Sequence, residues 1–299
     1  MSEIKSVAIA GASGAVGTHV LQALLNAGFQ VTVLTRSKKA GAYDASVKVV
    51  EVDFTSLESL TAALQNIDAA VSTVAGEAIP VQGVLIDAAA AAGVKRFIPS
   101  EYGSCTTHPE LQTYPWYEDA FNIRQKLQEK ARAGKLTWTV VACGAFREFL
   151  FDRGMLLDFA KHEARLYDDG DNRVSSTSLA NLSKAIVGVF NNLEETKNKI
   201  VRVSEVIVTQ NQVLGIAAEL RPDITWKLSK VQTSALLKEG LDSARAGDYS
   251  FPTILKVLGG TALAGDTYGA AFDETDNSLL GVKEMTQEDL KKLVASKLA

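Results

Sequence analysis

Short apolar runs alternate with longer amphipathic segments along the first half of the chain. Six runs have the length and apolar content of buried parallel strands, and segments with helical spacing of apolar residues separate them. Between the first two runs, Val16, Val20 and Leu24 recur at this spacing and Gly28 marks the helix end. The expected strands are SVAIAG (6–11), VTVLTR (31–36), VKVVEVD (47–53), DAAVSTV (68–74), KRFIPS (95–100) and TWTVVAC (137–143), and further helices are expected at 56–67, 81–94 and 116–131.

This alternation predicts an α/β fold, with a Rossmann-type doubly wound parallel sheet and a smaller C-terminal α+β substrate region. The regular pattern weakens after the sixth strand. We expect an NAD(P)-binding Rossmann domain at 1–155 and a mostly substrate-binding region at 156–299, with 175–205 returning to the Rossmann core. Near the end, Thr286 followed by Asp289 predicts a capping box that opens a final helix.

Composition narrows the class of protein. The chain has 299 residues, of which 46% are hydrophobic, and this content is sufficient for a large core. The formal net charge is -4 and the basic residues are dispersed, so no nucleic-acid partner is expected. Two cysteines are too few for a disulfide framework, and no leader or membrane-spanning run is apparent. We therefore expect a cytoplasmic protein that acts on a small molecule, as a monomer or a homodimer.

A glycine-rich motif, GASGAVG, lies between the first strand and the first helix. Glycine permits a tight turn, lets backbone amides approach a pyrophosphate and allows the helix to pack against the strand, while the helix N-terminus stabilises the anion. This context predicts dinucleotide binding, and an ordinary tight turn is the alternative. The expected cofactor-binding residues of the motif are Gly11, Ala12, Ser13, Gly14, Ala15, Val16 and Gly17.

The end of the second strand favours NADPH over NADH. An acidic residue there would bind a ribose 2′-hydroxyl, but the sequence has LTRSKK, in which Arg36 lies 19 residues after Gly17. Arg36 can pair with a 2′-phosphate through its planar guanidinium, and Lys38 or Lys39 can add charge, although a solvated basic turn is the alternative. Asp53 and Phe54 are expected beside the adenine, and Val74 and Ala75 beside the ribose and nicotinamide.

The order of several motifs resembles the NmrA-like and isoflavone-reductase-like branch of the atypical short-chain dehydrogenases. These motifs are GASGAVG, TR after the second strand, KRFIPSEYG, TWTVVACGAFREFL, and DNSLLGVKEMTQEDL, which is similar to fungal members. The resemblance covers most of the chain. It implies NADPH in the Rossmann half and reduction of a small, often phenolic or aromatic secondary metabolite in a cleft beneath the C-terminal region. Some members bind the nucleotide without known turnover and act as regulators.

The chain departs from the reductases at the expected proton donor. The resemblance implies a lysine early in the helix after PSEYG, but Ala120 aligns with that position and a shift of one residue places Phe121 there. No Tyr-x-x-x-Lys pair is present. We interpret Lys126, six residues beyond Ala120, as solvent-exposed. The remaining candidates for proton donation are Tyr117, Tyr102, Ser100 and water, and Phe146, Phe149 and Trp226 are candidate walls of the substrate pocket.

Three hypotheses follow from the sequence. The first is an NADPH-dependent reductase of a small aromatic or otherwise unsaturated metabolite. The second is a nucleotide-responsive regulator, which would explain an intact glycine motif together with the missing lysine. The third is a repurposed isomerase, dehydratase or cyclase on the same fold, because fold alone does not fix the reaction.

Overall fold

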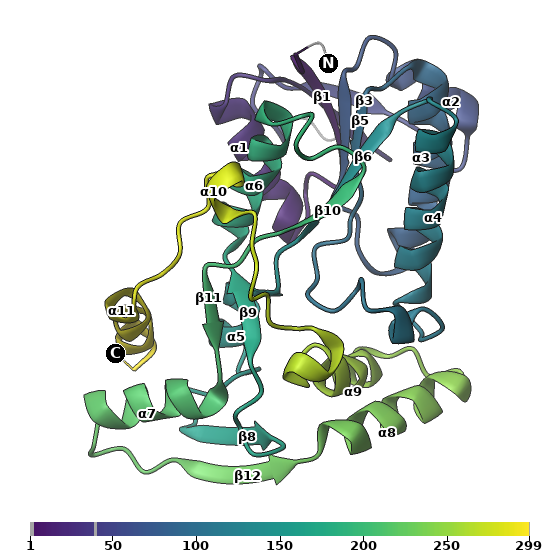
Figure 1. Cartoon of the computed structure of the whole chain (residues 1–299). Helices are drawn as coiled ribbons and strands as arrows, with labels where there is room; N and C mark the ends of the chain where they lie inside the picture. The colour runs from purple at the N-terminus through teal and green to yellow at the C-terminus, as the bar shows by residue number, and fades with distance from the viewer. Residues whose placement is uncertain (1–2, 39–40, 299) are drawn as a thin grey trace.

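A parallel sheet forms the centre of the molecule (Figure 1). The computed structural model describes residues 3–38 and 41–298, so Lys39, one of the predicted cofactor ligands, lies outside the described residues. The sheet has seven strands in the order β10-β6-β5-β4-β1-β2-β3, and all six expected strands belong to it. The strands are β1 (Ser6–Ala10), β2 (Gln30–Thr35), β3 (Lys48–Glu51), β4 (Ala69–Ser72), β5 (Arg96–Ile98), β6 (Thr137–Ala142) and β10 (Lys199–Arg202).

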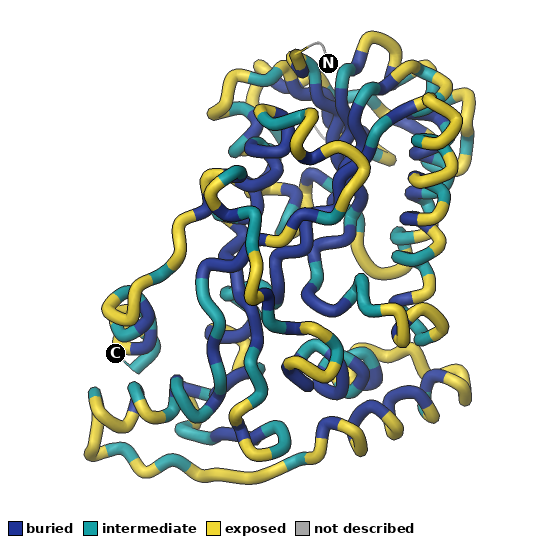
Figure 2. Tube along the Cα trace, viewed as in Figure 1, coloured by how far each residue is buried: buried dark blue, intermediate teal, exposed yellow. Residues whose placement is uncertain are grey.

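Helices cover both faces of this sheet, which explains why its strands are apolar on both sides. One face packs against α1 (Ala15–Asn26) and α6 (Leu179–Asn191), and the core there includes Leu24 and Ile186. The other face packs against α2 (Leu57–Ala63), α3 (Gln82–Ala92) and α4 (Glu118–Arg132). Figure 2 shows the buried residues concentrated along the strands and on the inner sides of these helices. The predicted doubly wound α/β fold is confirmed.

The second half of the chain forms smaller sheets and a group of helices below the main sheet in Figure 1. One small sheet has the order β11-β9-β7 and the other pairs β12 with β8. The strands are β7 (Ala145–Phe146), β8 (Glu163–Tyr167), β9 (Val174–Thr177), β11 (Val206–Val208) and β12 (Lys227–Val231). The helices are α5 (Arg147–Asp152), α7 (Gln210–Leu220), α8 (Thr233–Arg245), α9 (Phe251–Thr261), α10 (Asn277–Leu280) and α11 (Gln287–Lys297), and the short 3-10 helices of the chain are η1 (Gly76–Val81), η2 (Pro109–Leu111) and η3 (Gly265–Tyr268).

The segment 175–205 contributes to the main sheet. Its strand β10 pairs in parallel with β6, with Val201 opposite Val141, and its helix α6 packs against α1. The division of the chain at residue 155 stays a prediction. At the start of α11, the predicted capping box is confirmed, because Thr286 Oγ1 accepts a hydrogen bond from the Asp289 amide and Asp289 accepts one from the Thr286 amide.

Two expectations about the segment after β5 were wrong. The helix expected from residue 116 begins two residues later, because Trp116 has a left-handed φ of 67° and Tyr117 is the N-cap of α4. Lys126 is half-buried rather than solvent-exposed, because its ammonium pairs with Asp87 of α3 at 2.6 Å. Among the helices within 3–38 and 41–298, none is long and apolar enough to span a membrane.

Candidate cofactor-binding site

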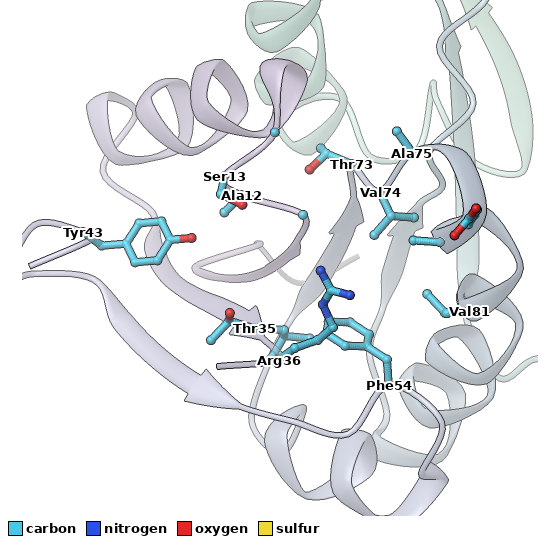
Figure 3. Close-up of a pocket in the computed structure, with 15 residues that line it drawn as sticks. Ala12, Ser13, Thr35, Arg36, Tyr43, Phe54, Thr73, Val74, Ala75 and Val81 are labelled. Carbon is cyan, nitrogen blue, oxygen red and sulfur yellow. The ribbon is translucent and has the colours of Figure 1, made fainter. Parts of the chain in front are cut away.

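A cavity of about 690 Å³ opens at the carboxyl ends of β1, β2 and β4 (Figure 3). Its volume lies within the range of small-molecule sites, and its position is the usual ligand position in open α/β sheets. The turn after β1, the end of β2 and the loop after β4 form its walls. The predicted cofactor residues that line it are Gly11, Ala12, Ser13, Gly14, Arg36, Phe54, Val74 and Ala75.

Two positions of the glycine turn leave no room for a Cβ atom. Gly11 has a left-handed φ of 85°, and a Cβ there would lie 2.7 Å from the carbonyl carbon of Thr73 at the end of β4. A Cβ on Gly17 would lie 2.1 Å from the Gly11 carbonyl oxygen. The Gly14 amide donates a hydrogen bond to this same carbonyl at 3.0 Å. The glycines therefore hold the turn close to both β4 and α1.

The turn also presents the N-terminus of α1. Gly14 is the N-cap and has no side chain that could satisfy the amides of the first helical turn. Such amides together with the helix dipole bind anions, and a pyrophosphate fits this environment. Ala15, Val16 and Gly17 begin α1 behind the turn and do not line the cavity, so their contacts with a cofactor stay predictions.

Arg36 follows β2 and lies on the side of the cavity away from the glycine turn. Its exposed side chain points into the cavity near the ring of Phe54 in Figure 3. The Thr35 hydroxyl donates to the Ser37 carbonyl at 3.0 Å, which stabilises the turn that carries Arg36. The Lys38 amide donates to Glu51 at 3.0 Å. These hydrogen bonds hold the turn around Arg36 and do not involve its guanidinium, so the charged group is available at the cavity.

Asp53 lies beside the cavity rather than in its wall. It lines an adjoining hollow together with Arg36 and Phe54. Its Oδ1 accepts hydrogen bonds from the Thr55 hydroxyl at 2.7 Å and from the Thr55 amide at 2.8 Å. These hydrogen bonds lower the pKa of Asp53, so the carboxylate is charged at neutral pH. Asp53 thus stabilises the turn before α2 and lies close to where an adenine is expected.

Sequence reasoning missed several residues of the cavity wall. Tyr43, for example, comes from the loop between β2 and β3. Thr73 belongs to the stretch STVAG, expected beside the ribose and nicotinamide, and its hydroxyl donates to the Ala10 carbonyl at 2.9 Å. A single aromatic residue in the polar loop AGAYDAS was the available signal for Tyr43. The missed wall residues are Leu34, Thr35, Tyr43, Glu77, Ala78 and Val81.

Each of the candidate hydroxyl donors is already hydrogen-bonded within the protein. The Ser100 hydroxyl donates to the Val74 carbonyl at 2.6 Å, which connects the end of β5 to the cavity wall. The buried Tyr102 hydroxyl donates to the Ser72 carbonyl at 2.7 Å. Burial raises the pKa of Tyr102 above its ordinary value. The roles of Ser100 and Tyr102 in proton donation stay predictions.

Tyr117 lies in a different environment from these two residues. Its hydroxyl is 2.6 Å from the Thr261 hydroxyl of α9 and 3.4 Å from the Cys105 thiol, inside an apolar cluster with Leu237 and Val257. Burial raises the pKa of Tyr117 well above its ordinary value. The hydroxyl therefore connects α4 to α9, and its role as proton donor stays a prediction.

Ala120, at the position where a lysine was expected, lies half-buried in the first turn of α4. One turn later, Arg124 is buried and pairs with Glu101 at 2.7 Å. The Arg124 guanidinium also lies 4.3 Å from the centre of the Phe121 ring. A charged pair thus lies one helical turn from the position that lacks a charged side chain.

The predicted aromatic pocket walls do not form one group. The rings of Phe146 and Phe149 lie 5.7 Å apart, and the Arg153 guanidinium lies 4.4 Å from the Phe149 ring. Trp226 packs instead against Phe159, at 5.8 Å, in another apolar cluster. Phe146 and Phe149 stay predicted substrate contacts, as does Trp226. No group of residues suited to hold a metal ion is present in the described part of the chain.

The fold and the cavity define a dinucleotide-binding protein of the Rossmann type. The sequence profile of the NmrA-like family matches residues 3–219, and the chain belongs to this family.

Individual relatives agree with this assignment. Oxidoreductase poxI of Penicillium oxalicum is 29% identical over 290 residues, which cover 94% of this chain and 91% of the relative. Pinoresinol reductase 2 of Arabidopsis thaliana is 29% identical over 241 residues, which cover 72% of this chain and 74% of the relative. Among solved structures, the Escherichia coli NADPH-dependent quinone oxidoreductase QOR2 complexed with NADPH has the same fold, with a TM-score of 0.75 and 19% identity over 98% of this chain and 100% of that one.

Proposed function

We propose that the chain is an NADPH-dependent reductase of a small aromatic or phenolic metabolite. The observation that carries this proposal is one cavity bounded on one side by the glycine turn at α1 and on another by Arg36. This pairing suits a dinucleotide that carries both a pyrophosphate and a 2′-phosphate. The relatives named as an oxidoreductase, a pinoresinol reductase and a quinone oxidoreductase complexed with NADPH support it.

The residues present fit this cofactor. The turn 11–14 and the first amides of α1 would hold the pyrophosphate, because a side chain at Gly11 or Gly17 would fill the space that the close approach requires. Arg36 would pair with the 2′-phosphate, and Phe54 would lie beside the adenine. Val74 and Ala75 would flank the ribose and nicotinamide. When bound, NADPH supplies the hydride of the reduction.

A nucleotide-responsive regulator is the second candidate. The commitment of the Ser100, Tyr102 and Tyr117 hydroxyls to protein partners favours it, since none of them is free in this structure to protonate a substrate. Ala120 supplies no charge in their place. A regulator would bind NADPH and NADP through the same cavity without consuming either.

The experiment compares cofactor binding with turnover in the full chain. Calorimetry would measure the affinity for NADPH and NADH, and absorbance would follow NADPH oxidation with a benzoquinone or pinoresinol as acceptor. The proposal expects preference for NADPH and oxidation that depends on an acceptor. NADPH binding without oxidation by any acceptor would favour the regulator, and product formation without net NADPH consumption would indicate an isomerase, dehydratase or cyclase. Absence of NADPH binding would refute all cofactor-based proposals.

A further inference from the structure

Glu101 is a buried carboxyl group just after β5, next to a residue that hydrogen-bonds to the wall of the cofactor cavity. Ser100, the preceding residue, donates to the Val74 carbonyl of the cavity wall. The Glu101 side chain is only 2% exposed. Its Oε1 accepts hydrogen bonds from Arg124 at 2.7 Å and from the Thr106 hydroxyl at 3.1 Å. Its Oε2 is buried and has no hydrogen-bond partner among the described residues.

This arrangement stabilises the carboxylate on one oxygen only. A buried charged oxygen without a donor is costly, and adding a proton removes that cost. Burial therefore raises the pKa of Glu101 to about 7, although Arg124 and the Thr106 hydrogen bond act in the opposite direction. In the described part of the chain, Arg124 of α4 is the charged group that faces this carboxyl, and Thr106 is the polar one. Glu101 can thus gain and lose a proton near neutral pH.

We propose that Glu101 stores the proton that completes the reduction and that the Thr106 hydroxyl delivers it to the substrate. This inference rests on the proposed reductase function. Thr106 is half-buried, whereas Glu101 is enclosed, so Thr106 is the more exposed member of the pair. Glu101 acts through it and is a positioning residue. The tyrosine and serine hydroxyls around it already donate to, or share hydrogen bonds with, protein groups.

Proton transfer along this pair conserves bonds and charge. Hydride addition to a carbonyl or a conjugated double bond leaves an anion that needs one proton. The O–H bond of Thr106 breaks as its proton passes to this anion, and the O–H bond of Glu101 breaks as its proton passes to Thr106 Oγ1. The products are the neutral reduced substrate and a carboxylate that accepts hydrogen bonds from Arg124 and Thr106, the two contacts present in the structure. A proton from solvent then returns to Glu101 through Thr106, because the Glu101 side chain is itself enclosed.

The first test measures the protonation of Glu101 without any substrate. Infrared difference spectra of the wild type against Glu101→Gln would be recorded through neutral pH, with Glu110→Gln as the matched control, because Glu110 is an exposed carboxylate of the same loop. We expect the band of a protonated carboxyl group to disappear around pH 7 in the wild type and in E110Q, and to be absent from E101Q. A wild-type protein without this titration overturns the proposal.

The second test measures turnover with a benzoquinone as acceptor. Thr106→Val and E101Q should each lower kcat on the order of 100-fold and leave the KM for NADPH within about twofold, whereas Thr106→Ser and E110Q should retain kcat. The pH dependence of kcat around neutrality should also be lost in E101Q. Because the amide oxygen introduced by E101Q can still accept from Arg124, this variant should fold, and thermal unfolding checks that it does. T106V with full activity overturns the proposal.

The two proposals fail in different ways. A wild-type protein that binds NADPH but reduces no acceptor refutes the reductase function and this inference together. A wild-type protein that turns over but lacks the carboxyl titration refutes the role of Glu101 alone.

Discussion

Substitution Gly17→Ala tests whether the tight contact between α1 and the glycine turn builds the cofactor site. The added Cβ would lie 2.1 Å from the Gly11 carbonyl oxygen and 2.8 Å from the Ala12 Cα, whereas ordinary contact begins at 3.4 Å. The Gly11 carbonyl oxygen would have to move away by 1.3 Å, the difference between the contact distance of 3.4 Å and 2.1 Å. This carbonyl also accepts the Gly14 amide at 3.0 Å, so its retreat weakens the hydrogen bond that closes the turn.

The magnitude follows from these two effects. Overpacking costs about 1–3 kcal/mol and the weakened hydrogen bond about 1 kcal/mol, so G17A should lose about 2–4 kcal/mol of unfolding free energy. The displaced turn also presents its amides wrongly to a pyrophosphate. Loss of one hydrogen bond to the charged pyrophosphate costs about 1.5–3 kcal/mol, and each 1.4 kcal/mol corresponds to about tenfold in affinity, so NADPH binding should weaken by about tenfold or more.

Calorimetric titration with NADPH and urea denaturation would measure these effects. The matched control is Gly83→Ala, a helical glycine of α3 whose added Cβ would meet nothing within 4 Å. We expect this control to gain up to about 1 kcal/mol of stability and to keep its NADPH affinity. If G17A bound NADPH within about twofold of the wild type, the steric account of the site would be refuted.

Three further substitutions have defined outcomes. Arg36→Gln should weaken NADPH binding about tenfold and leave NADH binding nearly unchanged, because it removes one exposed charge-assisted contact. Calorimetry would measure both affinities, and equal effects on the two cofactors would contradict the pairing of Arg36 with the 2′-phosphate. Asp68→Asn should cost about 1–2 kcal/mol at pH 7 in urea denaturation. Partial burial acts to raise the pKa of Asp68, but hydrogen bonds from Lys95 and neighbouring amides lower it to about 2. The stabilisation by Asp68 is therefore present above about pH 4 and lost as the pH falls towards 2. If the unfolding free energy of D68N fell with pH in this range as steeply as that of the wild type, this account would be contradicted. Thr286→Ala should cost about 1 kcal/mol through loss of the capping box with Asp289, and an unchanged melting temperature would contradict it.

The sequence was sufficient to predict the strands of the main sheet because their apolar runs are buried on both faces. It was also sufficient to predict that the glycine turn and Arg36 lie at one edge of the sheet, since both follow strands at positions that the βαβ unit fixes. The sequence was not sufficient to predict contacts made by loops. Tyr43 reaches the cavity from a loop whose path depends on tertiary packing, and no local periodicity reports such a position.

The proton-donor region shows a second limit. Sequence reasoning named Ser100, Tyr102 and Tyr117 because they have hydroxyl groups near the expected site. Their hydrogen-bond partners come from distant segments; Thr261, for example, lies 144 residues after Tyr117. The unpartnered oxygen of Glu101 could not be predicted either, since it depends on the burial of this side chain beside Arg124 of α4. Composition and spacing report which groups exist, whereas their availability depends on packing.

The pairing of β10 with β6 has a consequence for synthesis on the ribosome. A nascent chain that has emerged only as far as β6 contains every strand of the main sheet except β10, and the edge of β6 from Thr139 to Ala142 still lacks its partner. The face that α6 covers is also open until that helix emerges. Such an exposed edge can pair with other chains. The nucleotide-binding half therefore cannot complete its fold until residue 202 has left the exit tunnel, and in this interval the chain is most exposed to aggregation and to chaperone binding.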